Sequence, residues 1–508
     1  MTTALSATGE DGMAASAVGQ RSRRDTSSAP AWARGAHART LAGSWLARHP
    51  AWPIVALLAG YPLWWALGIA DFMFPLLAIP MAARMFGWRA HGRTIRLPPG
   101  FGLWLLFLLW VVAGAVTLSL TAPGTVDSAV SHRIISFVNR GTQYAGVTVL
   151  LLYAGNLTRQ ELSRRQLAWL LGLLAIYATA GGVLGMLDPG LQFSSPALAL
   201  MPNSLQNNVQ IQAMMHPGLS QIQTVLGAPE GRPKAPFDYT NTWGNCLALL
   251  LPWLLAAWWS HGTRRQRWIA AGVAVISVAP IIYSLNRGVW LALGVACVYL
   301  TVRLAARGRV ALLGAMCGGL VLIILAIVAT PLQQVIALRF QHQKSNSLRS
   351  SLSVVAAEDA LASPIIGYGD TRQQIGGPQS IAVGPTANCR NCGQAAVGSN
   401  GQLWLLLVCN GIVGASLYLL FFARALWRYR RDMTPYGLAG SLAVLMSFVF
   451  MISYDAVGAP LAITMLSVAL LWRNDRERAR DGAISAGQHP AAELDDAGPV
   501  RWPAPTRG

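Results

Sequence analysis

The chain has 508 residues, of which 54% are hydrophobic and only 12% charged, and its mean hydropathy is +0.42. Soluble domains carry about 25% charged residues, so this composition excludes an ordinary soluble protein. The formal net charge of +19 lies mostly in short connectors between apolar runs and in two tails. Anionic lipid headgroups and membrane orientation explain such a distribution, so we expect membrane lipids as partners and no nucleic acid.

Apolar runs follow one another along most of the chain. A spanning helix needs ~20 apolar residues, and two of the runs barely reach this length. In chain order the runs cover about 51–69, 71–87, 101–121, 134–155, 166–187, 239–259, 267–285, 288–304, 310–331, 401–422, 436–454 and 458–473. The pattern predicts an all-α, polytopic membrane protein with about 12 transmembrane helices.

Basic clusters follow every second run and orient the chain. They occupy residues 84–96, 159–165, 264–267, 303–309 and 424–431, and both ends of the chain carry arginines on the same side. By the positive-inside rule, that side is the cytoplasm. We therefore predict a multi-pass protein of the cytoplasmic membrane with both termini inside and two long extracytoplasmic loops, about 188–238 and 332–400.

Both ends of the chain differ from its centre. Residues 1–48 and 475–508 have little to pack, which predicts disordered cytoplasmic tails around a transmembrane helical domain at 49–474. The first run lacks a clear small-residue cleavage site, so we interpret it as a retained span.

Cysteine usage is uneven. Four cysteines lie within apolar runs, where they are expected to be small buried hydrophobes: Cys246, Cys297, Cys317 and Cys409. Cys389 and Cys392 form Cys-Arg-Asn-Cys in the second outer loop. A zinc or redox site would need a second pair or a thioredoxin-like context, so a local disulfide is preferred over free or metal-bound thiols.

Cations collect on the predicted outer face, opposite to the positive-inside bias. Arg232 and Lys234 precede a span, Arg287 lies in a short outer hairpin, and Arg349 opens the second long loop. Guanidinium groups are always charged and offer a planar fork of donors, which suits phosphate. The pattern predicts an anion-binding site at the membrane surface.

Each of these residues also has a plainer interpretation. Arginines just outside a span, such as Arg133 and Arg339, often reach lipid headgroups. Arg140 lies about two turns into an apolar run, so it must face a partner or a wet cavity. Asp71, Asp127 and His216 are expected to be ordinary loop residues, and Asp455 to break a helix pair.

The order of several short motifs resembles the O-antigen ligase and O-antigen polymerase superfamily over residues 130–425. The motifs are Pro-Phe-x-Tyr-Thr-Asn-x-Trp-Gly at 236–244, Asn-Arg-Gly-x-Trp at 286–290, Ser-Pro-Ile-Ile-Gly-Tyr-Gly at 363–369, Gly-x-Leu-Trp at 401–404 and Asn-Gly-Ile-Val-Gly at 410–414. Each motif is short, and their order within the two-loop topology carries the resemblance.

This resemblance implies a metal-independent glycosyltransferase without cofactors. Its donor would be a polyprenyl-diphosphate-linked glycan, and its acceptor a saccharide or a second lipid-linked glycan outside the membrane; partners from polysaccharide export stay an open expectation. By this analogy Arg232 and Arg287 hold the diphosphate and Arg349 assists, because fixed guanidiniums stabilise the charge of the leaving group. Further substrate contacts are expected from Lys234, Tyr239, Asn241, Arg140, Asn400 and Gln402.

One departure concerns the general base. Ligases of the family commonly carry a histidine before the span that follows the second long loop. Here Ser399, Asn400 and Gln402 occupy that place, and none is a good base. His342, Glu358 and Asp359 are the substitutes, with His342 the catalytic candidate. The missing histidine favours a polymerase, or a branch of the family with unassigned chemistry, over a ligase.

The second long loop has a pattern of its own. Apolar positions between 349 and 362 predict a short amphipathic helix over the site, and residues 367–401, rich in Gly, Gln and Asn, predict a saccharide-facing flap.

Two other functions stay open. A transporter or flippase of lipid-linked saccharide would show related halves and polar residues at the membrane midplane. The chain shows no repeat between its halves, and its cations crowd the outer edge. A cell-wall polymerase of the shape, elongation and division type would depend on an acidic residue, with Asp127, Asp238 and Asp455 as candidates. An alanine scan would distinguish this class from the O-antigen ligase and polymerase class.

Overall fold

The computed structural model describes residues 49–126, 130–202, 209–224, 229–329, 332–341, 344–374 and 396–485. The chain divides into Met1–Pro50, of which residues 49 and 50 are described, and Ala51–Gly508, which contains every element below. Asp127, His342 and the predicted disulfide between Cys389 and Cys392 lie outside the described residues, as does nearly all of the predicted N-terminal tail.

Most of the described chain is helical, with few strands, which confirms the predicted helical class. The first part contains α2 (Trp52–Ala59), α3 (Tyr61–Ala66), α4 (Met73–Ala90), α5 (Phe101–Ala113), η1 (Gly114–Thr117), α6 (Val130–Asn156), α7 (Arg164–Leu187), η2 (Pro196–Leu200) and α9 (Val209–Met215). The second part contains α10 (Thr240–Leu254), η3 (Leu255–Trp259), α11 (Arg264–Ile276), α12 (Val278–Tyr283), α13 (Arg287–Ala305), α14 (Val310–Val328), α15 (Leu332–Gln341), α16 (Lys344–Ala362), α17 (Gln402–Tyr429), α18 (Pro435–Phe450) and α19 (Ala459–Ser485).

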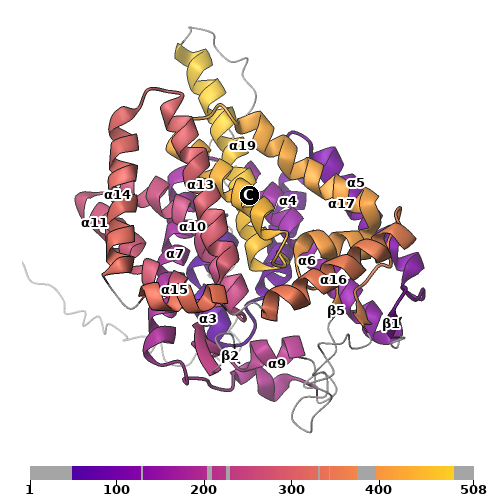
Figure 1. Cartoon of the computed structure of the whole chain (residues 1–508). Helices are drawn as coiled ribbons and strands as arrows, with labels where there is room; N and C mark the ends of the chain where they lie inside the picture. The colour runs from indigo at the N-terminus through magenta and orange to yellow at the C-terminus, as the bar shows by residue number, and fades with distance from the viewer. Residues whose placement is uncertain are drawn as a thin grey trace, which may run out of the picture. The chain divides into compact units, whose positions relative to one another are not determined.

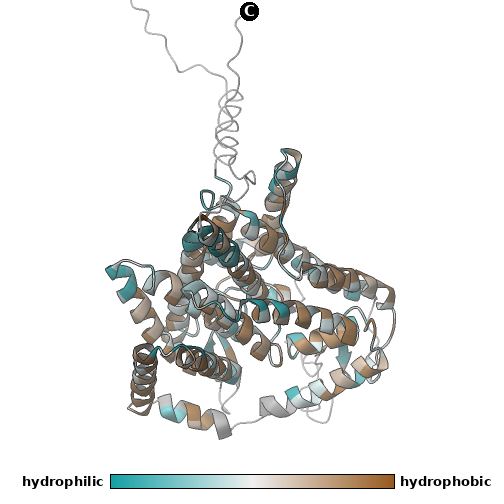
Figure 2. Cartoon of the chain, turned by 90° about the horizontal axis from the view of Figure 1, so that it is seen from above, coloured by the Kyte–Doolittle hydropathy of each residue, from teal (hydrophilic) through white to brown (hydrophobic). Residues whose placement is uncertain are grey.

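Four of the described helical segments are long and apolar enough to cross a membrane. They are Arg164–Leu187, Arg264–Tyr283, Arg287–Ala305 and Gln402–Tyr429, and Phe101–Thr117, Leu313–Leu322 and Pro435–Phe450 are apolar but shorter. The predicted total of about twelve spans therefore stays a prediction. Figure 2 shows hydrophobic residues along many of the helices.

The first predicted run is divided into two short helices. α2 ends at Ala59, Gly60 follows, and Pro62 lies in the first turn of α3. Glycine weakens a helix and proline supplies no N–H, so the two residues together interrupt a run that is otherwise apolar. Neither helix alone reaches the length of a span.

The interior is built from helices that are distant in the sequence. α10 packs against α7 and α18, α6 against α4 and α19, and α17 against α5 (Figure 1). Trp104 is fully buried among aromatic rings, 5.1 Å from Phe107 and 5.3 Å from Phe421 between centroids. Its indole N–H donates to the Thr148 hydroxyl at 2.7 Å, so the polar atom of this core residue is satisfied.

α14 has an unusually apolar exposed surface. Val310 is 73% exposed and Leu322 is 68% exposed, and the helix packs mainly against α13 and α15. It lies at the edge of the molecule in Figure 1. Such a surface is expected of a helix that faces lipid.

The predicted outer loops contain regular structure. In the first, β2 (Ser220–Thr224) pairs antiparallel with β3 (Pro229–Pro233), with Gln221 opposite Arg232. In the second, the helix predicted at 349–362 is present as part of α16. Strands β1 (Thr125–Val126), β4 (Arg372–Gln374) and β5 (Ala396–Val397) form a sheet in the order β1–β4–β5.

α19 continues to Ser485, which corrects the prediction that the C-terminal tail begins at residue 475. Acidic residues among the arginines explain the extension, because they pair with other helices. Asp475 lies 3.1 Å from Arg428, and Asp481 lies 3.0 Å from Arg159. Exposed pairs are individually weak, but several in sequence hold a helix to the protein.

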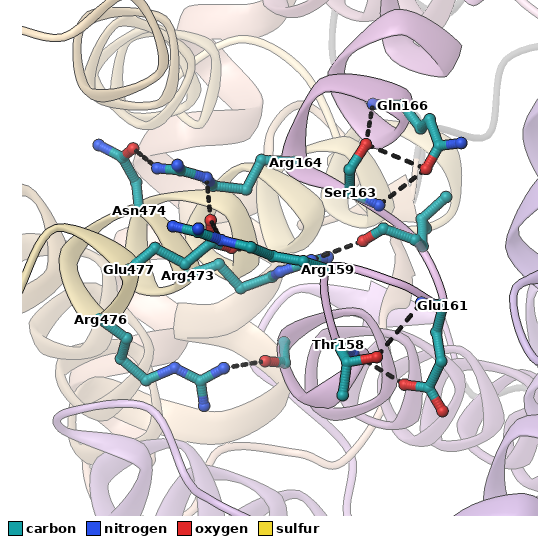
Figure 3. A network of polar contacts seen from close by, with 12 residues as sticks. Thr158, Arg159, Glu161, Ser163, Arg164, Gln166, Arg473, Asn474, Arg476 and Glu477 are labelled. Carbon is teal, nitrogen blue, oxygen red and sulfur yellow. Dashed lines mark hydrogen bonds and ion pairs between the residues drawn. The ribbon is translucent and has the colours of Figure 1, made fainter. Parts of the chain in front are cut away.

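A polar network joins α19 to the segment before α7 (Figure 3). Glu477 accepts from Arg159 and from Arg164, both at 2.6 Å, and Arg473 donates to the Leu162 carbonyl at 2.6 Å. Ser163 and Gln166 form a capping box at the start of α7. All of these residues lie on the side predicted to be cytoplasmic, so the network fixes the end of the bundle remote from the predicted anion site.

Two of the motifs pack directly against each other. Gly411, with φ +65°, interrupts α17, and the Ile412 N–H donates to the Pro364 carbonyl at 2.7 Å. A Cβ at Gly411 would lie 2.6 Å from the Ile365 carbonyl oxygen. The glycine is thus required for both its backbone conformation and its lack of a side chain.

We expect Gly411→Ala to lower the free energy of unfolding by about 1–3 kcal/mol, because the left-handed backbone and the carbonyl contacts both oppose a Cβ. Thermal unfolding in detergent measures the change. Gly318→Ala in α14 is the control, because an added Cβ there meets no atom within 4 Å. Equal melting temperatures for the two variants would contradict this explanation of the motif.

Candidate functional site

Arg232 is held at the end of the β2–β3 hairpin. It is 8% exposed, and its Nε donates to the Ser284 carbonyl at 2.6 Å. Its two terminal nitrogens donate to Gln223 and, at 3.4 Å, to Asn241. These three partners are neutral groups, and they orient the guanidinium.

Arg287 is the first residue of α13, next to a buried tyrosine hydroxyl. The Tyr454 hydroxyl donates to the Asn286 side-chain oxygen, and the Gly288 N–H donates to the same hydroxyl at 3.2 Å. Asn286 also caps α13 by accepting from the Val289 N–H. The positive end of a long helix therefore adds to the charge of Arg287.

Arg349 lies on the other side of Tyr454. It donates to the Ser453 carbonyl, and its guanidinium carbon is 5.2 Å from the centre of the Tyr454 ring. Asn400 donates to the Arg349 carbonyl at 3.4 Å and to the Ser353 hydroxyl at 2.7 Å. Tyr454 thus links the segments that carry Arg287 and Arg349.

Gln402 holds the turn at residues 453–456, which follows α18. It is fully buried; its side-chain oxygen accepts from the Ala456 N–H at 3.1 Å, and its nitrogen donates to the Tyr144 hydroxyl at 3.2 Å. The predicted substrate residues Asn400 and Gln402 therefore make internal contacts that shape the turn at 453–456. Their contact with a substrate stays a prediction.

Arg140 forms an ion pair with Asp370. The two side chains are 11% and 5% exposed, and Arg140 also donates to the Gly369 carbonyl at 3.3 Å. The partner expected for a charge inside an apolar run is thus a carboxylate. This pairing favours a structural role over the predicted contact with substrate.

Two carboxyl groups meet in segments that are distant in the sequence. The side chains of Asp71 and Asp238 are hydrogen-bonded to each other, which corrects the expectation that Asp71 is an ordinary loop residue. Burial and the neighbouring Asp238 raise the pKa of Asp71 well above its usual range, and burial raises the pKa of Asp238 to about 6. Burial lowers the pKa of Lys234, and Asp238 partly offsets this effect.

Two further acidic residues differ in their surroundings. Asp455 keeps accessible surface, yet the protein around it raises its pKa, so it is reachable by water and partly desolvated. Asp359, a suggested base, is fully buried, and burial raises its pKa to about 6. Glu358, the other suggested base of α16, is exposed.

An arrangement of arginines of this kind is chemically suited to an anion. Among the described residues, no group of three His, Cys, Asp or Glu residues is placed to hold a metal ion. The predicted cations Arg232, Arg287 and Arg349 come together around Ser284, Asn286 and Tyr454. Tyr239, which precedes α10, has its pKa raised to about 12 by burial and the nearby carboxyls.

A comparison with protein families found one match. Residues 271–386 match the model described as O-antigen ligase, and this segment contains Arg287 and Arg349 but neither Arg232 nor Tyr454. Searches of curated proteins and of solved structures gave no match. The match confirms the predicted resemblance over residues 271–386, and the enzymes of that family are broadly of the ligase and polymerase type.

Proposed function

We propose that the protein transfers a glycan from a polyprenyl diphosphate donor to an acceptor hydroxyl outside the cytoplasmic membrane. The observation that carries this proposal is the convergence of three cation-bearing segments. Arg232 donates to the Ser284 carbonyl, three residues before Arg287, and Tyr454 connects the start of α13 to Arg349.

The arginines match the charge that the reaction creates. When the bond between the sugar and the phosphate breaks, the departing diphosphate gains negative charge. Fixed cations and the N-terminus of α13 stabilise that charge more in the transition state than in the ground state. Carbonyl groups hold the guanidiniums of Arg232 and Arg349 in their orientation.

The predicted orientation puts the arginines on the outer side of the membrane. α7 and α11 begin at Arg164 and Arg264, in clusters assigned to the cytoplasm. Arg232 precedes α10 and Arg287 begins α13, and both helices are predicted to start on the opposite side. A donor anchored in the lipid by its polyprenyl chain would therefore meet these cations at the outer surface.

The test is a reconstitution in proteoliposomes with a polyprenyl-diphosphate oligosaccharide. Released polyprenyl diphosphate and product length are followed in wild type, Arg232→Ala and Arg287→Ala. Turnover that lengthens the lipid-linked glycan would establish a polymerase. Turnover that needs a separate acceptor would establish a ligase, and an intact donor that only changes leaflet would replace the proposal with a transporter.

Tyr454→Phe should slow donor turnover by about tenfold. The loss of its hydroxyl removes two hydrogen bonds at the start of α13, each worth about 1 kcal/mol, while the ring still packs against Arg349. The same proteoliposome assay measures it. Tyr436→Phe, at the opposite end of α18, is the control, and equal rates in the two variants would exclude Tyr454 as the link between the arginines.

A further inference from the structure

Asp71 and Asp238 bring two carboxyls together from distant parts of the chain. Asp71 lies between α3 and α4, and Asp238 lies between β3 and α10. Their side chains are hydrogen-bonded, and both residues are only partly buried. A Cβ added at Gly458 would lie 3.4 Å from the Asp71 Oδ1, so this pair adjoins the segment that contains Tyr454 and Asp455.

A hydrogen bond between two carboxyls requires one shared proton. The hydrogen bond raises the pKa of Asp71 and lowers that of Asp238. Burial nevertheless leaves the pKa of Asp238 at about 6, so Asp238 is ionised at neutral pH and close to its titration point. A group with these properties is suited to accept a proton near neutral pH.

Gln143 lies next to Asp71 and has an unsatisfied polar atom. Its nitrogen donates to the Asp71 carbonyl at 2.9 Å, and the residue is only 4% exposed. Its side-chain oxygen is buried and has no partner among the described residues. A buried acceptor without a donor is costly, and a hydroxyl group of a ligand would satisfy it.

We propose that Asp238 accepts the proton of the attacking acceptor hydroxyl and that Asp71 positions Asp238 for this step. The inference rests on the proposed glycan transfer and assigns its general base. The hydroxyl oxygen bonds to the anomeric carbon of the donor, and its proton passes to an Asp238 carboxylate oxygen. The bond from that carbon to phosphate breaks, and polyprenyl diphosphate leaves with the electron pair.

The carboxyl pair and the arginines lie on adjoining segments of the chain. Asp238 follows Arg232 in one continuous segment. Gly458, which adjoins Asp71, belongs to the segment whose Ser453 carbonyl accepts from Arg349. The arginines would therefore meet the leaving group while the carboxylate meets the nucleophile. This assignment supplies a base where the family histidine is replaced by Ser399, Asn400 and Gln402.

Other charged and titratable groups face the pair and influence its titration. They are Lys234, Tyr239, Tyr61, Cys246 and Asp455. Since the base must be ionised, we expect turnover to fall as the pH drops through about 6. Asp71→Ala would remove a donor that lowers the pKa of Asp238 and move this limb to higher pH, whereas Asp71→Asn would keep an N–H donor and the original limb.

The decisive experiment compares two nucleophiles in proteoliposomes. A hydroxyl acceptor must lose a proton, whereas azide attacks the donor without losing one and gives a glycosyl azide. We expect Asp238→Asn to slow transfer to the hydroxyl acceptor by about 100-fold or more and to retain azide-dependent release of polyprenyl diphosphate. Arg287→Ala should lose both reactions.

Asp188→Asn, an exposed aspartate of the same outer loop, is the matched control. Thermal unfolding and donor binding establish that each variant is folded. Hydroxyl transfer retained in Asp238→Asn, or both reactions lost in a folded variant, would overturn the assignment. Wild-type protein that turns over no donor would instead reject the proposed function itself.

Discussion

Arg287→Ala should slow the release of polyprenyl diphosphate in proteoliposomes by about 100- to 1,000-fold. This is the range measured when one donor to a developing oxyanion is removed from an enzyme. The effect should appear in kcat as well as in kcat/KM, because the charge on the leaving group is larger in the transition state than in the bound donor.

Substitution by lysine distinguishes charge from geometry at this position. Arg287→Lys keeps the positive charge but loses the planar fork, so it should recover only part of the rate. Arg307→Ala, at an exposed arginine after α13, is the control for a change in net charge. If Arg287→Ala altered only the KM for donor, the arginine would bind ground state and transition state equally, and the leaving-group role would be wrong.

The three candidate arginines could be singled out from the sequence, whereas the residues that contact them could not. Arg232, Arg287 and Arg349 stand out because they lie at the outer ends of apolar runs, against the charge bias that orients the chain. The motif order adds that Arg287 and Arg349 belong together, and the family match covers both. The glycines of the later motifs also have a physical explanation, since Gly411 packs against the Pro364–Ile365 carbonyls.

The carboxyl pair and Tyr454 escaped prediction for a different reason. Asp71 lies at the junction of two apolar runs, where an aspartate is common in a connecting loop. Nothing near it in the sequence indicates that Asp238 will be its partner. Tyr454 ends a run in which any aromatic residue would suit a membrane interface. Only tertiary packing of α6, α10, α13 and the turn before α19 brings these residues together, and a single sequence contains no signal for such contacts. The break at Gly60 and Pro62 was also missed, because the first run was predicted as one span from its apolar composition alone.

Arg372→Met should lower the free energy of unfolding by about 3 kcal/mol or more, with a smaller effect on the turnover of the folded fraction. Arg372 is 1% exposed, and its Nη2 donates to the Leu120 carbonyl at 2.8 Å and to the Tyr368 carbonyl at 3.0 Å. Its Nη1 donates to the Asp370 carbonyl at 2.9 Å. Methionine fills similar space but leaves these buried acceptors unpaired, each at a cost of about 1–3 kcal/mol.

The predicted loss reflects what Arg372 holds together. The segment after η1 has no helix of its own, and the guanidinium joins it to the strand β4 and to Asp370, which in turn pairs with Arg140. Thermal unfolding in detergent measures the loss, with Arg431→Met at an exposed position as the control. A melting temperature equal to that of wild type would mean that water replaces the guanidinium at these carbonyls. A stable variant that lost turnover would instead mean that Arg372 acts in catalysis and not in stability. The arginines that act on substrate would then include one more than the three near Tyr454.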